Sequence, residues 1–204
     1  MPDENCKKCG GIGEYYDNFI PIAGGSMGLG LPGAVGLALA KKLKGEDGKV
    51  YVLMSDGELA IGTTWESILI ARHHKLDNLV VIIDNNELQA MGNMKDILPI
   101  HPFYRMAQDY GWDTYSTSGH YFNPVNINEP GVIRVWSSRD GLWHGGDHIE
   151  NVVFEYHKKD KPKLVMFSTI KGKGVSFMEN NNLFHYKAPN EEEYRKALEE
   201  LNAL

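Results

Sequence analysis

Two short polar clusters contain residue types that bind metal ions through oxygen. They are Asp56-Gly57 and Asn85-Asn86, and each follows a run of mostly β-branched and aliphatic residues after one intervening residue. Mg²⁺ takes oxygen ligands in a near-octahedral shell and commonly shares that shell with phosphate groups of a bound molecule. The carboxylate of Asp56, the amide oxygen of Asn86 and a main-chain carbonyl near Leu88 could supply three protein ligands. The pattern therefore predicts a site for Mg²⁺ and a diphosphate.

A strand, a helix and a second strand are needed to hold these clusters at one edge of a sheet. The runs Val50–Met54 and Leu79–Ile83 are typical of buried parallel strands, and residues 64–74 between them show helical spacing. This order predicts a right-handed crossover, and ligands of such sheets collect beyond the carboxyl ends of the strands. There the backbone N–H groups of Gly57 and Glu58 could bind phosphates, as helix N-termini bind anions.

The rest of the chain continues the alternation of strands and helices. We expect a polar tail at residues 1–19 and one α/β domain at residues 20–204, with a doubly wound, mostly parallel sheet and helices on both faces. Residues 121–146 interrupt the pattern and indicate an inserted hairpin or lid, or else a tolerated surface excursion. The other expected elements are a glycine-rich loop at 24–33 before a helix near Pro32, helices at Pro102–Tyr110, at His148–Lys158 and from Asn190, strands at Asp113–Thr117 and Leu164–Ser168, and capping boxes at Thr63/Glu66 and Asn190/Glu193.

Composition and charge argue against several classes of function. The chain has 204 residues, 42% of them hydrophobic, which suffices for one buried core. A net charge of -6 argues against a nucleic-acid partner, and no apolar run is long enough to span a bilayer. The first residues lack the apolar segment of a secretory signal, so we expect a cytoplasmic protein. Cys6 and Cys9 could form half of a zinc site or a redox pair, but without further cysteines we interpret them as idle thiols.

Several separated segments resemble one enzyme family in the same order. They are GGSMGLG, then SDGELAIG, WES and DNN, and finally TIKGKGVSFMENNNLFHYKAP. Together they resemble the diphosphate-binding half of transketolase, a thiamine-diphosphate enzyme, over roughly residues 20–118 and 147–200. Agreement of several ordered motifs is more specific than any single short motif.

The resemblance implies roles for the residues that match the family's metal and diphosphate site. Asp56, Asn86 and the carbonyl of Leu88 would bind Mg²⁺ or another divalent cation. Gly57 and His185 would contact the diphosphate of the cofactor, and His185 is also the candidate catalytic residue.

The resemblance further implies contacts to the organic part of the cofactor. Gly25 would contact the aminopyrimidine through its carbonyl, and Met27 would support the bent cofactor as an apolar prop. No motif points to His101, His144 or His157, which we interpret as ordinary packing or surface residues.

The implied activity is the transfer of a two-carbon ketol unit from a ketose, expected to be a sugar phosphate, to an aldose. In the family a second, pyrimidine-binding domain supplies the carboxylate that activates the cofactor, and this chain ends at Leu204 without one. We therefore expect half of a split enzyme, completed by a C-terminal transketolase subunit in a heterotetramer or a homodimer-type assembly.

The chain also departs from the family pattern. Ser55 replaces the first glycine of the family's Gly-Asp-Gly, and Ile61 replaces a glutamate linked to proton communication between paired sites, a route that is missing unless Glu58 substitutes. The family's opening helices are absent, so their residues would come from another subunit, or the chain is a shortened or degraded copy. Two alternatives stay open: another thiamine-diphosphate enzyme, of the decarboxylating 1-deoxyxylulose-phosphate synthase type, and a non-catalytic cofactor-binding or scaffold subunit.

Overall fold

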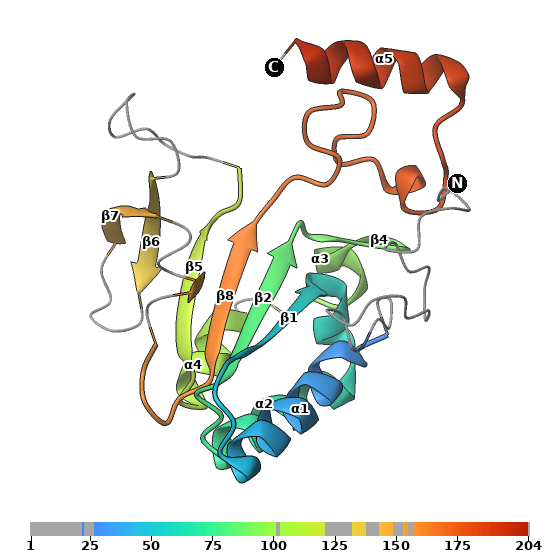
Figure 1. Ribbon diagram of the computed structural model, residues 1–204. Coiled ribbons are helices and arrows are strands. Elements are labelled where there is room, and N and C mark those ends of the chain that lie inside the picture. Colours follow the sequence, from blue (N-terminus) through green and yellow to red (C-terminus); the bar gives the residue numbers. More distant parts are fainter. Residues whose placement is uncertain are drawn as a thin grey trace.

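A six-stranded sheet forms the centre of the molecule, in the order β1-β2-β8-β5-β6-β7 (Figure 1). The computed structural model describes residues 22, 27–100, 103–120, 153–154 and 157–203, together with the backbone of 132–137 and 143–148. Strands β1, β2, β8 and β5 pair in parallel, whereas β6 and β7 form an antiparallel hairpin beside β5. The predicted α/β fold with a mostly parallel sheet is confirmed. The strands are β1 (Val50–Ser55), β2 (Leu79–Asn85), β5 (Asp113–Ser118), β6 (Val132–Ser137), β7 (Trp143–His148) and β8 (Lys163–Ser168).

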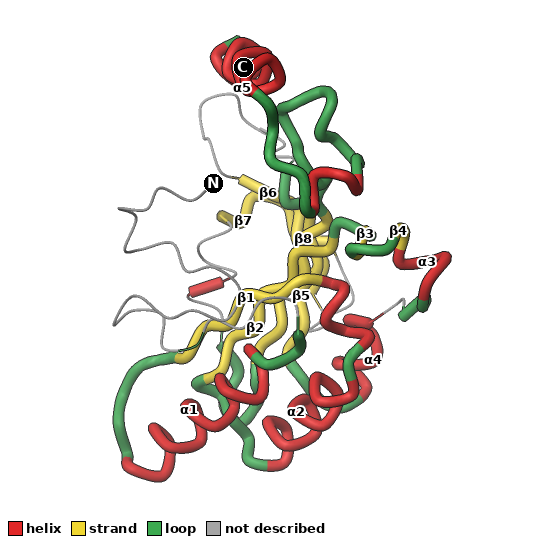
Figure 2. The backbone as a smooth tube through the Cα atoms, turned by 90° about the vertical axis from the view of Figure 1, so that its right-hand side faces the viewer, coloured by secondary structure: helices red, strands yellow, loops and turns green. Residues whose placement is uncertain are grey.

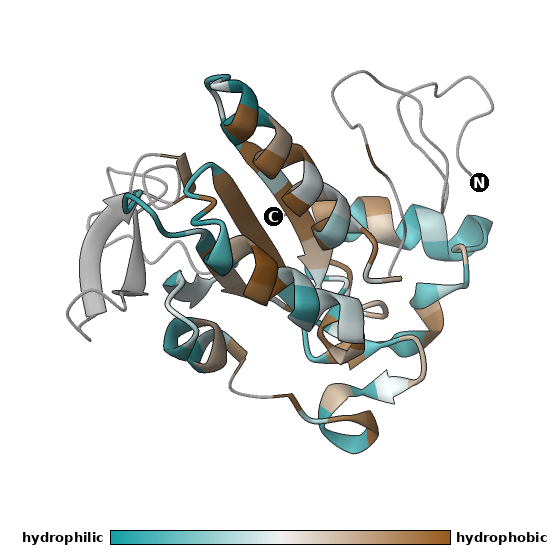
Figure 3. Ribbon diagram, turned by 90° about the horizontal axis from the view of Figure 1, so that it is seen from below, coloured by the Kyte–Doolittle hydropathy of each residue, from teal (hydrophilic) through white to brown (hydrophobic). Residues whose placement is uncertain are grey.

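Three helices cover one face of the parallel strands (Figure 2). They are α1 (Gly30–Lys44), α2 (Gly62–His73) and α4 (Phe103–Asp109). Their small and aliphatic residues recur at helical spacing, so one stripe of each helix packs on the sheet. Figure 3 shows strongly hydrophobic strands beside helices that also carry hydrophilic residues. The remaining helices are the short α3 (Met94–Ile97) and the terminal α5 (Glu191–Asn202).

Alternation along the strands divides the core between the two faces of the sheet. Ile83 and Met166 face the helices, whereas Ile82 and Val165 point to the opposite face. Among the described residues, the opposite face is covered by Val153 and Phe154 rather than by a long helix. Helices on both faces were expected, and the described helices account for one of them.

One local prediction is wrong, and a second differs from the structure at its ends. Thr63 and Glu66 do not form a capping box, because α2 already begins at Gly62 and the Thr63 hydroxyl donates to the carbonyl of Gly28 instead. Of the helix predicted at His148–Lys158, His148 instead ends strand β7, residues 153–154 have π-helical backbone and residues 157–158 have no regular structure, while the rest of that range lies outside the described residues.

The other predicted helices and strands that fall on described residues agree with the structure within a few residues, and the Asn190/Glu193 capping box of α5 is confirmed. The predicted tail at 1–19 and part of the segment 121–146 lie outside the described residues. No helix in the described part of the chain is long and apolar enough to cross a membrane. Cys6, Cys9, Gly25 and His101 lie outside the described residues.

Candidate functional site

The first cluster forms a tight turn directly after β1. Residues Asp56–Ala60 make a 3₁₀ turn, η1, whose N-cap is Ser55. The Asp56 side chain is fully buried, and its Oδ2 accepts a hydrogen bond from the backbone N–H of Glu87 at 2.6 Å. A buried carboxylate at the carboxyl end of a strand is thereby directed towards the end of the neighbouring strand.

The second cluster turns sharply after β2. Glu87 has a φ of 61°, in the left-handed region that residues other than glycine rarely adopt. This conformation directs the N–H of Glu87 to Asp56 and the N–H of Leu88 to the amide oxygen of Asn86, at 3.0 Å. Consecutive backbone N–H groups thus donate to Asp56 and to Asn86 at the same edge of the sheet.

The donor set at this edge fits a magnesium ion. Asp56 offers a carboxylate, Asn86 an amide oxygen, and Leu88 a carbonyl at the start of the two-residue strand β3 (Leu88–Gln89). Hard oxygen donors that leave part of the shell to phosphate are the arrangement that Mg²⁺ prefers. Within the described ranges no three His, Cys, Asp or Glu side chains lie together in a way that could hold a metal ion. The donor set at this edge does not depend on such a group, because Asp56 is its only carboxylate and its other two oxygens are an amide and a carbonyl. The structure thus brings together Asp56, Asn86 and Leu88.

Gly57 and Glu58, whose N–H groups are predicted to contact the diphosphate, lie in η1 at the carboxyl end of β1. A side-chain carbon built on Gly57 would make ordinary van der Waals contacts, at 3.8 Å, with Gln89 and with the Ser55 hydroxyl. Gln89 belongs to β3, which pairs antiparallel with β4 (Gly92–Asn93). The turn of η1 and the β3–β4 hairpin therefore lie next to each other at the carboxyl ends of β1 and β2.

Glu58 has a role that the sequence reasoning missed. Its side chain is 5% exposed and accepts from three groups: the N–H of Ser55 at 2.8 Å, the Ser55 hydroxyl at 3.3 Å and the N–H of Gly28 at 3.3 Å. The carbonyl of Gly28 accepts from the Thr63 hydroxyl at 3.0 Å. The glycine-rich segment is thus held to η1 by the N–H of Gly28 and to α2 by its carbonyl. The signal available in the sequence was the Ser55-x-x-Glu58 spacing of a capping box.

Met27, predicted as an apolar prop, lies next to this tethered glycine and is 60% exposed. Gly28 has a φ of 64°, and a side-chain carbon added to it would come within 2.8 Å of Ile61. The segment that carries Met27 therefore packs closely on the residue that follows η1.

His185 lies at the end of the 3₁₀ turn η3 (Asn182–His185), with its side chain exposed. The side-chain amide of Asn182 donates to the carbonyl of Ala90 at 2.8 Å, which fastens η3 to the loop between β3 and β4. In Figure 1 the segment after β8 extends beyond the carboxyl ends of the strands. His185 thus belongs to a segment that adjoins the Asn86–Leu88 turn.

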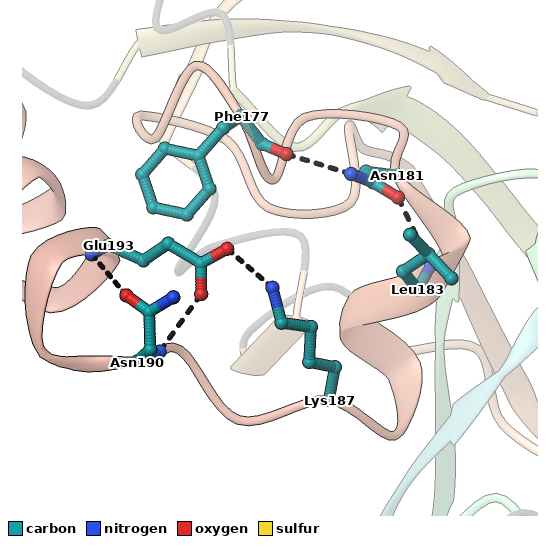
Figure 4. Close-up of polar contacts among 6 residues, drawn as sticks. All are labelled: Phe177, Asn181, Leu183, Lys187, Asn190 and Glu193. Carbon is teal, nitrogen blue, oxygen red and sulfur yellow. Dashed lines mark hydrogen bonds and ion pairs between the residues drawn. The ribbon is translucent and has the colours of Figure 1, made fainter.

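The segment around η3 is supported by its own polar contacts (Figure 4). The Asn181 side chain donates to the carbonyl of Phe177 and accepts from the N–H of Leu183 at 3.1 Å. Lys187 pairs with Glu193 at the start of α5, and this pairing, followed by the Asn190 N–H, lowers the pKa of Glu193. These contacts hold the η3 turn between the sheet and α5.

A cavity of about 540 Å³ lies beside Asn86 on the face of the sheet opposite the helices. Three of its polar residues, Asp84, His120 and Thr169, were not selected from the sequence. His120 accepts the backbone N–H of Ile170 at its Nε2, at 2.6 Å. The cavity is lined by Leu53, Ile82, Asp84, Asn86, Gly119, His120, Phe167, Thr169, Ile170, Lys171 and Gly172.

A parallel α/β sheet with an acidic turn, an amide turn and a tethered glycine segment at one edge defines a diphosphate-cofactor-binding class of protein. Comparison with known proteins identifies the family within that class. The family model described as "Transketolase, thiamine diphosphate binding domain" matches residues 5–129, so the chain belongs to this transketolase family.

The relatives include named subunits of transketolases. The chain is 37% identical over 177 residues to one of the subunits of the apulose-4-phosphate transketolase of Actinobacillus succinogenes, covering 87% of this chain and 55% of that protein. It is 30% identical to "6-deoxy-6-sulfo-D-fructose transketolase subunit SqwG" of a Clostridium species, covering 89% of this chain and 58% of that protein. The chain thus spans a little over half the length of these relatives.

Solved structures show the same fold. Transketolase from Campylobacter jejuni superposes with a TM-score of 0.68 at 26% identity, covering 89% of this chain and 26% of that one. A Pichia stipitis transketolase, at 21% identity, gives a TM-score of 0.67 and covers 89% of this chain and 25% of that one.

Proposed function

We propose that this chain binds Mg²⁺ through Asp56, Asn86 and the carbonyl of Leu88, and binds thiamine diphosphate through that ion. The observation that carries the proposal is that the consecutive N–H groups of Glu87 and Leu88 donate to the side-chain oxygens of Asp56 and Asn86. Thiamine diphosphate, when bound, supplies a carbon nucleophile and an electron sink for cleavage next to a carbonyl.

The chain's own residues would bind and orient the cofactor. The N–H groups of Gly57 and Glu58 and the imidazole of His185 would contact the diphosphate, since they lie on the two segments adjoining the metal turn. The Gly25 carbonyl would contact the aminopyrimidine, and Met27 would lie against the cofactor. The tether between Gly28 and Glu58 supports this arrangement, because it holds the glycine segment next to the metal ligand.

We propose further that the reaction is the transfer of a two-carbon ketol unit from a ketose to an aldose, with sugar phosphates as substrates. Two relatives carry names of transketolase subunits, which supports both this reaction and a second subunit with a pyrimidine-binding domain. A heterotetramer or homodimer-type assembly in the cytoplasm is the proposed setting.

A cofactor-binding subunit without turnover is the second candidate. Ile61 favours it, because an apolar side chain packed against Gly28 stands where the family has a glutamate. Turnover in the presence of a pyrimidine-domain subunit decides between the two candidates. If only the assembled pair transfers ketol units, the transketolase proposal holds, and cofactor binding without turnover in that pair supports the alternative.

Calorimetry with thiamine diphosphate and Mg²⁺ tests the cofactor site directly. We expect Asp56→Ala and Asn86→Ala each to weaken cofactor binding by on the order of 100-fold or more, because each removes a metal ligand. Asp96→Ala is the matched control, since Asp96 is exposed on α3, and Cys6→Ser is a second control. Equal affinity in all four variants would place the site elsewhere.

A further inference from the structure

The side-chain amide of Asn86 has two ends that differ chemically, and only one of them can bind a cation. Its oxygen is an acceptor, whereas its NH₂ group is a donor and repels a metal ion. In the structure the NH₂ group donates to Oδ2 of Asp84 at 3.4 Å, and the oxygen lies on the side of the Leu88 N–H. The contact with Asp84 therefore distinguishes the two ends of the amide.

Asp84 is suited to this task because an ionised carboxylate can only accept hydrogen bonds. An amide flipped at position 86 would place its oxygen against this carboxylate and lose the bond. Asp84 alternates with Asn85 at the end of β2, so its side chain points to the cavity face of the sheet.

The Asp84 carboxylate is itself held from the neighbouring strand. The hydroxyl of Thr169, directly after β8, donates to Oδ1 of Asp84. The backbone N–H of Thr169 donates to the carbonyl of Asn85 at 3.0 Å, which fixes the threonine against β2. One carboxylate oxygen is thus bound by Thr169 and the other remains for the amide of Asn86.

We propose that Asp84, held by Thr169, is a positioning residue that keeps the amide oxygen of Asn86 directed to the metal ion. This inference depends on the proposed Mg²⁺ site. Groups that orient metal ligands commonly contribute about 10- to 100-fold to metal affinity. Neither residue contacts the ion in this arrangement.

The first test is Mg²⁺ binding in the presence of thiamine diphosphate, measured by calorimetry on the full chain. Asp84→Ala should weaken Mg²⁺ binding by about 10- to 100-fold. Thr169→Val, which removes the hydroxyl, should weaken it less but in the same direction, and Thr169→Ser should retain wild-type affinity. Thermal unfolding of each variant shows whether it is folded.

A swap of the two side chains separates orientation from a merely structural role. Asp84→Asn and Asn86→Asp should each weaken Mg²⁺ binding. In Asp84→Asn two amides face each other, so either end of the Asn86 amide can find a partner and its oxygen is no longer held towards the ion. In Asn86→Asp two carboxylates face each other and repel. The double variant restores one donor and one acceptor with unchanged net charge. In it the amide introduced at position 84 would still accept from Thr169 and would donate to the carboxylate introduced at position 86, so we expect most of the affinity to return.

Each outcome has a distinct meaning. A double variant that binds no better than its weaker single variant overturns the positioning role of Asp84. So does a strong effect of Asn86→Ala combined with no effect of Asp84→Ala. If Asn86→Ala itself leaves Mg²⁺ binding unchanged, the metal site is wrong and the inference falls with it.

Discussion

Replacing Glu58 by glutamine tests whether its carboxylate holds the glycine segment to the Asp56 turn. In the structure Oε2 accepts from the Ser55 N–H at 2.8 Å, and Oε1 accepts from the Gly28 N–H at 3.3 Å. Glutamine has the same shape but only one oxygen, which should stay with Ser55, the residue that offers two donors. The NH₂ group then faces the Gly28 N–H, donor against donor.

The size of the effect follows from the loss of one buried acceptor. A buried N–H without a partner costs about 1–3 kcal/mol, so we expect Glu58→Gln to lower the free energy of unfolding by about 2 kcal/mol. For a chain of this length each kcal/mol shifts Tm by about 2–4 °C, which gives a fall of about 4–8 °C. Glu58→Ala should cost more, because both N–H groups lose their acceptor.

Thermal unfolding followed by circular dichroism measures this shift, and amide hydrogen exchange locates it. The Gly28 N–H should exchange at least about fivefold faster in Glu58→Gln, since the loss of about 1–3 kcal/mol is local to that amide. Glu66→Gln, on the exposed side of α2, is the matched control and should change Tm by less than about 1 °C. A Tm equal to that of the control, with unchanged exchange at Gly28, would refute the tether.

Gly28→Ala should destabilise the fold by about 2 kcal/mol or more, because the new carbon would meet Ile61 at 2.8 Å and the φ of Gly28 is 64°. Gly36→Ala should instead stabilise the fold by about 0.5–1 kcal/mol, because Gly36 lies in α1 and an added carbon would meet no neighbour within 4 Å. Urea titrations of the two variants check both signs. The pKa of His157 is lowered, chiefly by burial and then by Lys163, so the unfolded chain binds the proton more readily and stability falls as pH drops through about 6.5, the unfolded pKa. His157→Asn should remove the loss of stability that His157 causes on acidification. The difference between Tm values measured about one pH unit above and one below this pKa should therefore be smaller than in wild type. An unchanged difference would contradict the assignment.

The part of the fold around Asp56 and Asn86 was predictable because local signals agree there. Two β-branched apolar runs ended in turn-forming polar residues, and a helical pattern of the right length joined them, so both strand order and the shared edge followed. The start of the helix predicted at His148–Lys158 was misplaced because the antiparallel pairing of β7 with β6 extends to His148, a contact with Val132 that no local pattern contains.

The supporting residues of the site were harder to find because their contacts join distant segments. Asp84 meets Thr169, and His120 meets the N–H of Ile170, across neighbouring strands that are far apart along the chain. One signal was present in the sequence: Asp84 directly precedes Asn85-Asn86 and, by strand alternation, shares a face with Asn86. Carboxylates adjacent to predicted ligands are therefore candidates for positioning roles even when they bind nothing themselves.

The geometry of Glu58 also bears on the missing glutamate at position 61. Glu58 could replace that residue in communication between paired sites only if its carboxylate were free to reach another subunit. Both of its oxygens instead accept hydrogen bonds within the chain, from Ser55 and Gly28, and the side chain is 5% exposed. Releasing it would leave the buried N–H of Gly28 and the partly buried N–H of Ser55 unpaired, at a cost of about 1–3 kcal/mol for the buried one. Coupling between sites, if the assembled enzyme has it, therefore requires a residue other than Glu58 and Ile61.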